Sequence, residues 1–205
     1  PKRAKKLYFD IIPKTTDEYF SHSKKYEEQT AEEKIENPVW HLHNGQPSNV
    51  NFPVTYTLLL NLASVCHAED IDVVWGYVSS YAPNLKRSAE LDSLIQLAVN
   101  YYKEKIEPYK KYRLPDEKER KGLIELVQIL KTLDDNTSSD EIQSIVFGIG
   151  KKLEYQNLRD WFKGLYETVL GQSEGPRMGS FIKLYGIEST KLLLEKVLEG
   201  HLSNK

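Results

Sequence analysis

Residues 170–187 read LGQSEGPRMGSFIKLYGI and join two helical patterns through a glycine–proline elbow. Proline fixes its own φ and suits the first position of a helix, so Pro176 predicts that Arg177 lies in a helix's first turn. In that position the side chain and the unpaired backbone N–H groups can both face an anion. The alternative interpretation is a helix–turn–helix corner with a solvated arginine.

Helical periodicity extends through most of the chain. Capping-box patterns, Thr15 with Glu18 and Ser138 with Glu141, mark two helix starts. Residues 35–53 lack a helical period and predict an irregular connection. No strand pattern appears, so we expect an all-α fold, a helical bundle or cage without substantial sheet. The expected helices cover about residues 15–28, 53–65, 69–80, 86–107, 115–130, 138–153 and 157–170, with two short helices around Gly186.

A polar run of sequence DDNTSS at residues 134–139 is typical of a linker. It predicts that the helices form two lobes. The proximal lobe would comprise residues 1–134, and the distal lobe residues 138–205.

The composition is that of a globular protein, with 40% hydrophobic and 28% charged residues among 205. No apolar run approaches the roughly 18 residues that a membrane helix needs. Cys66 is the single cysteine, which favours a reducing compartment, and we expect the cytoplasm. Because the chain opens on Pro-Lys-Arg rather than methionine, we expect a piece of a longer protein.

Cations are unevenly placed, although the net charge of −2 argues against indiscriminate nucleic-acid binding. One cluster comprises Lys2, Arg3, Lys5 and Lys6. Between residues 101 and 121 a second cluster, including Lys110 and Lys111, alternates with four tyrosines. Interleaved cations and aromatic rings can hold phosphates and stack unpaired bases. The alternative is a solvated helix face, because five acidic residues share this stretch.

Signs of self-sufficient catalysis are weak. His41, His43, Cys66 and His67 lack the spacing of a metal site, and no glycine-rich loop follows a strand. We therefore expect no catalytic residue, metal or cofactor in this chain by itself.

Three stretches resemble class I lysyl-tRNA synthetases. They are residues 1–10, PKRAKKLYFD; residues 37–45, NPVWHLHNG; and residues 158–162, LRDWF, which continue into the 170–186 block. The chain is similar to the C-terminal, all-helical anticodon-binding region of that family. The segment His41-Leu42-His43-Asn44 is not the family's catalytic histidine signature, because it has no internal glycine.

The resemblance implies a division of labour in a longer enzyme. A Rossmann catalytic domain of the same polypeptide, which uses ATP with Mg²⁺, would attach lysine to tRNA. The present chain would bind tRNA with a lysine anticodon and would be inactive alone, with no role for a membrane.

A lysine anticodon is rich in uridine, whose edge offers carbonyl acceptors and one N–H. Arg177 as donor and Gln172 as donor and acceptor suit that edge. Trp161, Phe181 and Tyr185 are candidate stacking residues, although helical spacing also fits core positions. Lys110 and Lys111 are candidate phosphate contacts.

Two other functions stay open at this point. A helical protein-interaction module without nucleic-acid binding would use the stretch 101–121 as a partner surface. A stand-alone helical hydrolase is the third hypothesis.

Overall fold

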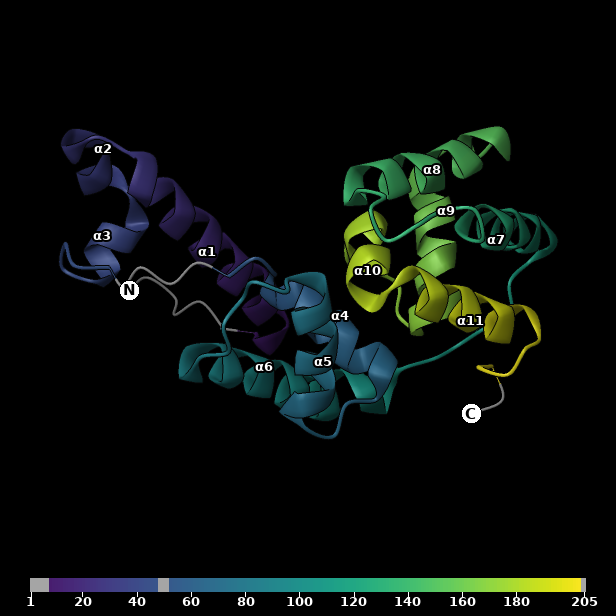
Figure 1. Ribbon diagram of the computed structural model, residues 1–205, viewed down its shortest axis with the longest axis horizontal. Coiled ribbons are helices and arrows are strands. Elements are labelled where there is room, and N and C mark those ends of the chain that lie inside the picture. The colour runs from purple at the N-terminus through teal and green to yellow at the C-terminus, as the bar shows by residue number, and fades with distance from the viewer. Residues whose placement is uncertain (1–7, 48–51, 204–205) are drawn as a thin grey trace, which may run out of the picture. The chain divides into compact units, whose positions relative to one another are not determined.

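The computed structural model describes residues 8–47 and 52–203 (Figure 1). These residues form helices and connecting loops without a strand, which confirms the all-α prediction. The cluster Lys2, Arg3, Lys5 and Lys6, with most of the first matched stretch, lies outside the described residues. The chain divides into two compact units, Pro1–Thr57 and Leu58–Lys205.

The first unit is built on the long helix α1 (Ile12–Glu28), which follows the short 3₁₀ turn η1 (Phe9–Ile11). Two short helices, α2 (Ala31–Glu36) and α3 (Pro38–Leu42), fold back beside it. Buried Asn37 connects them. Its amide donates to the His22 carbonyl at 3.1 Å, and its Oδ1 accepts from the Val39 N–H at 3.0 Å. One side chain therefore both caps α3 and attaches it to α1.

The second unit opens with α4 (Tyr56–Cys66), whose first two residues belong to the first unit, followed by α5 (Ile71–Tyr81) and α6 (Ala89–Tyr101). Helix α6 continues as the π-helical turn η2 (Tyr102–Ile106) and the 3₁₀ turn η3 (Glu107–Tyr109). Pro108 lies in that last turn, where a helix cannot continue regularly. An extended segment follows and leads to the remaining helices.

The rest of the second unit contains α7 (Glu117–Leu130), α8 (Ser139–Lys152), α9 (Leu158–Leu165), α10 (Met178–Tyr185) and α11 (Ile187–Leu198). Helix α9 runs into the π-helical turn η4 (Tyr166–Leu170). Trp161 of α9 is fully buried and donates through Nε1 to the Val146 carbonyl at 2.9 Å. Its ring fills the space left by Gly122 of α7 and Gly150 of α8.

Local sequence signals predicted some boundaries and missed others. The capping box of Ser138 and Glu141 is confirmed at the start of α8. The expected capping box at Thr15 is wrong, because α1 begins three residues earlier, at Ile12, with Pro13 in its first turn. Residues 35–53 were expected to be irregular but include α3. The predicted linker lies between α7 and α8, inside the second unit, and the division into lobes there stays a prediction.

Helices α8 and α10 lie side by side (Figure 1), and their backbones approach closely at Gly179. A Cβ atom at this position would lie 2.7 Å from the backbone nitrogen of Gln143 and closer still to the Ser139 carbonyl. The Gly179 N–H also donates to the Gln143 side chain at 2.8 Å. The elbow at residues 175–177 is therefore fixed against the first turns of α8.

We expect Gly179→Ala to lower the free energy of unfolding by about 1–3 kcal/mol, because the added methyl group meets backbone that cannot move alone. Urea denaturation measures the change. Gly148→Ala is the matched control on α8, where a Cβ meets nothing within 4 Å. This control should stabilise the protein by about 0.5–1 kcal/mol through helix propensity. Equal stability of the two variants would contradict the close approach.

Candidate nucleic-acid interface

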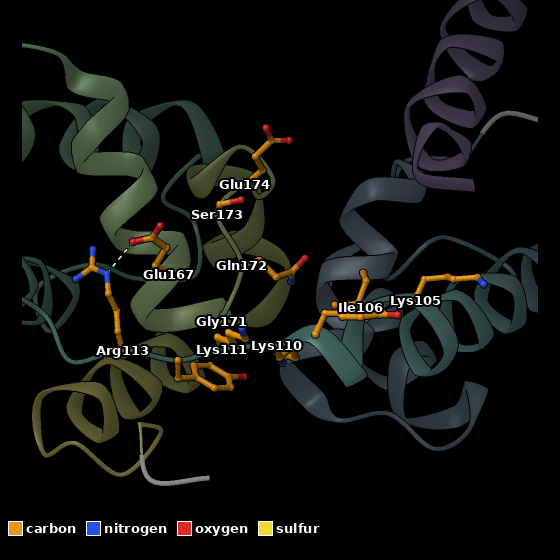
Figure 2. Close-up of a pocket in the computed structure, with 12 residues that line it drawn as sticks. Lys105, Ile106, Lys110, Lys111, Arg113, Glu167, Gly171, Gln172, Ser173 and Glu174 are labelled. Carbon is orange, nitrogen blue, oxygen red and sulfur yellow. Dashed lines mark hydrogen bonds and ion pairs between the residues drawn. The ribbon is translucent and has the colours of Figure 1, made fainter. Parts of the chain in front are cut away.

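A cavity of about 580 Å³ lies within the second unit between two segments that are far apart in sequence (Figure 2). One wall comes from η2, η3 and the extended segment after them. The other comes from η4 and the turn that follows it. The lining residues are Lys105, Ile106, Tyr109, Lys110, Lys111, Tyr112, Arg113, Glu167, Gly171, Gln172, Ser173 and Glu174.

Arg113 holds the extended segment against two helices. Its guanidinium donates two hydrogen bonds to Glu119 of α7, both at 2.6 Å, and a third from Nε to Glu167 of η4 at 2.7 Å. Glu119 is only 5% exposed and also accepts from the Asp116 N–H at 2.8 Å. The bonds to Glu119, opposed by burial and reinforced by Glu167, raise the pKa of Arg113. The Arg113 hydrogen bond likewise lowers the pKa of Glu167.

The opposite wall turns at Gly171, whose φ of +70° is left-handed. Its carbonyl accepts from the Lys111 N–H at 3.0 Å, which joins the two walls through the backbone. The Tyr112 ring lies against the same glycine, where a Cβ would approach ring carbons at 3.2 Å. Both the left-handed backbone angle and the neighbouring Tyr112 ring therefore favour glycine at position 171.

Lys110 is a half-buried cation at the base of the cavity. Its Nζ donates to the Ser64 carbonyl at 2.9 Å and lies 5.0 and 5.5 Å from the ring centroids of Tyr112 and Tyr102. It makes no ion pair with any carboxylate in residues 8–47 or 52–203. Burial lowers the pKa of Lys110 to about 8, against a smaller opposing effect of Glu107. The Gln172 side chain also contacts Ser64, because its amide donates to Ser64 Oγ at 3.4 Å.

These groups suit an unpaired nucleotide. Lys111 offers an exposed ammonium, Lys110 a partly desolvated one, and Tyr109 an aromatic ring that is 76% exposed. The Gln172 side chain can donate to or accept from a base edge. Proteins read unpaired RNA with this combination of cation, ring and amide.

Of the residues predicted from the sequence, the structure brings together Lys110, Lys111 and Gln172 (Figure 2). Arg177 does not line this cavity. It occupies the position before α10 rather than the expected first turn, since the helix begins at Met178. Its guanidinium pairs with exposed Asp140 of α8 at 2.7 Å.

The three candidate stacking residues differ in how far their rings are buried. Trp161 and Phe181 are fully buried core residues, so neither ring presents a face on which a base could stack. Tyr185 is half-buried between Phe181 and Tyr77, with ring centroids 5.6 and 5.3 Å away. It therefore offers less ring surface than Tyr109 does.

Four further residues contribute to the site although no sequence pattern marked them as functional: Ser64, Gly171, Glu119 and Glu167. Asp116 with Glu119 forms a capping box, a local signal that locates the start of α7. No local pattern shows that Glu119 is buried or paired with Arg113.

Neither a metal centre nor a membrane segment is found in the described part of the chain. Among those residues, no three His, Cys, Asp or Glu side chains come together in a group that could hold a metal ion. Likewise, none of the helices there is long and apolar enough to cross a membrane.

We expect Arg113→Ala to lower the free energy of unfolding by about 2 kcal/mol or more, because it leaves buried Glu119 without its cation. Chemical denaturation at neutral pH measures the loss. Arg177→Ala is the matched control, since it breaks a pair whose side chains are 52% and 78% exposed. That change should be under about 1 kcal/mol. A larger loss in the control would contradict this ranking.

The stability contributed by Lys110 should depend on pH. Its pKa, about 8 when folded, is below the ordinary 10.5, so the unfolded chain holds more protons between these values. The wild-type protein should therefore gain stability relative to Lys110→Met as pH rises from about 7 to about 10. Denaturation series at several pH values test this, with Lys111→Met controlling for loss of one charge. If the stability of wild type relative to Lys110→Met stays constant or decreases over this pH range, the lowered pKa of Lys110 is contradicted.

The comparisons with known proteins agree with the family named from the sequence. No family model matches the chain. The chain is 47% identical over 199 residues to a protein of Rickettsia felis named lysine–tRNA ligase. Proteins of the same name from Rickettsia peacockii and Rickettsia bellii are each 45% identical, over 199 and 202 residues.

These alignments cover 95–97% of the chain but only 38–39% of each relative. The chain thus spans well under half the length of the curated relatives that it matches. Over nearly all of its own length, the chain is a homologue of one part of the lysine–tRNA ligases.

Proposed function

We propose that this chain is the C-terminal, anticodon-binding region of a class I lysine–tRNA ligase and acts in the cytoplasm. A Rossmann domain elsewhere in the same polypeptide would carry out lysylation with ATP and Mg²⁺. This region would bind tRNA with a lysine anticodon and orient it, which contributes to the rate without bond chemistry of its own.

The observation that carries the proposal is the cavity shared by Lys110, Lys111 and Gln172. It lies in a chain that is similar along 95% of its length to lysine–tRNA ligases. Anticodon loops present splayed bases, and an open cavity with cations at its wall and an amide at its edge suits one such base with its phosphate.

The candidate residues have different roles in this proposal. Lys111 contacts phosphate, because its side chain is exposed. Gln172 reads a base edge inside the cavity. Arg177 acts outside the cavity, where its exposed pair with Asp140 can open at little energetic cost. Tyr109 is the better stacking residue, and Tyr185 stays a secondary candidate.

We expect the chain to bind a tRNA with a lysine anticodon more tightly than the same tRNA with its anticodon replaced. Filter binding or fluorescence anisotropy at one salt concentration measures both affinities. Gln172→Ala or Arg177→Ala should weaken binding of the first tRNA by about 1–3 kcal/mol and reduce the discrimination. Lys111→Ala should weaken both complexes alike and make the salt slope shallower by about 0.7.

Lys14→Ala serves as the control cation, because it removes a lysine whose side chain is 81% exposed, on α1 of the other unit. It should leave affinity and salt slope unchanged. Equal affinity of the wild-type chain for both tRNAs contradicts anticodon reading. Binding that is insensitive to salt would instead favour a protein-interaction module.

A further inference from the structure

Three aromatic rings form a row on α8 and on the helix formed by α9 and η4, with Phe147 exposed and the other two partly buried. Phe147 lies 6.2 Å from Phe162, and Phe162 lies 6.5 Å from Tyr166, measured between ring centroids. We call Phe147, Phe162 and Tyr166 the aromatic strip. The strip is distinct from the cavity, since none of its residues lines that cavity.

The Phe147 end of the strip is open and carries a cation. Phe147 is 39% exposed, and the Lys151 ammonium lies 5.1 Å from its ring centroid. Lys151 makes no ion pair with a carboxylate of the described residues. Beside them, a Cβ built on Gly148 meets nothing within 4 Å, and a shallow hollow of about 360 Å³ is lined by Gln143, Ser144, Phe147, Gly148 and Lys151.

The other end of the strip adjoins the cavity. Tyr166 precedes Glu167, which lines the cavity wall, and its hydroxyl donates to the Pro176 carbonyl at 2.8 Å. The turn that supplies Gln172, Ser173 and Glu174 to the cavity therefore ends against the Tyr166 ring. The strip and the cavity therefore meet at the turn of residues 172–176.

We propose that the aromatic strip carries an unpaired stretch of RNA that continues from the cavity, with bases stacked on Phe162 and Phe147 and a phosphate at Lys151. This inference rests on the proposed function. Two features favour RNA over an apolar protein partner. The strip adjoins a cavity lined by four cations, two carboxylates and an amide, and the Lys151 ammonium at its exposed end has no ion pair with a described carboxylate. Stacking on such rings tolerates any base, so the strip adds affinity rather than specificity.

The test uses the full chain and tRNA with a lysine anticodon. Phe147→Leu keeps apolar bulk but removes the aromatic face, whereas Phe147→Tyr keeps the face. We expect the dissociation constant to rise about tenfold for Phe147→Leu and to stay within about twofold of wild type for Phe147→Tyr. Lys151→Ala should make the salt slope shallower by about 0.7, as loss of one single-strand phosphate contact predicts.

Matched controls lie on other surfaces of the same unit. Leu192→Ala replaces a 50% exposed side chain of α11, and Lys131→Ala removes a cation that follows α7. Both should bind RNA like wild type, and thermal unfolding confirms that every variant is folded.

The outcomes separate this inference from the proposed function. If Phe147→Leu and Lys151→Ala bind tRNA like wild type while anticodon preference persists, RNA does not bind the aromatic strip, and the proposed function stands. Equal weakening by Phe147→Leu and Phe147→Tyr, or by Leu192→Ala, overturns stacking. A wild-type chain that binds no tRNA overturns both.

Discussion

The ion pairs of Arg113 with Glu119 and Glu167 determine how the cavity is built. The chain between Lys110 and Pro115 is extended and has no helical hydrogen bonds of its own. Arg113 attaches this segment to α7 and η4 through three hydrogen bonds of 2.6–2.7 Å. A buried carboxylate without its cation is costly, so Glu119 permits few alternative positions for the segment. Lys110, Lys111 and Tyr112 face the Gly171 turn as a consequence.

The helices around the site are closely packed, whereas the site itself contains a partly desolvated cation. Trp161 and the α8–α10 contact at Gly179 are close-packed and tolerate little change. Lys110, by contrast, is held partly desolvated by a carbonyl and two aromatic rings and makes no ion pair with a described carboxylate, although Glu107 is close enough to oppose the effect of burial on its pKa. In the proposed complex, a phosphate beside Lys110 would add the direct ion pair that the cation lacks in the described part of the chain. The helices thus position a partly desolvated cation, which the phosphate of the proposed RNA ligand would stabilise.

The sequence was sufficient for the fold class because amphipathic periodicity and caps are local signals. Ser138 and Glu141 are three residues apart and could be recognised together, and they do start α8. The same pattern at Thr15 was misleading, because Pro13 suits the first helical turn and the helix starts before the expected cap. Both cases depend on a few neighbouring residues, so tertiary contacts were not needed to state them.

The site was only partly predictable. The charges of Lys110 and Lys111 and the place of Gln172 in the elbow made these residues candidates. They lie together because the Lys111 N–H bonds to the Gly171 carbonyl, 60 residues away in the sequence. Helical spacing alone did not separate a stacking ring from a core ring. Trp161 and Phe181 are buried because of what packs on them from α7, α8 and α5, which the sequence does not display.

In the proposed function, the anticodon binds at this cavity. Photochemical crosslinking tests it most directly, using tRNA with 4-thiouridine at the first anticodon position and mass mapping of the attached peptide. We expect crosslinks within residues 105–113 or 171–177. Crosslinks confined to α1–α3 or α11, or none above those of a tRNA with another anticodon, would contradict it.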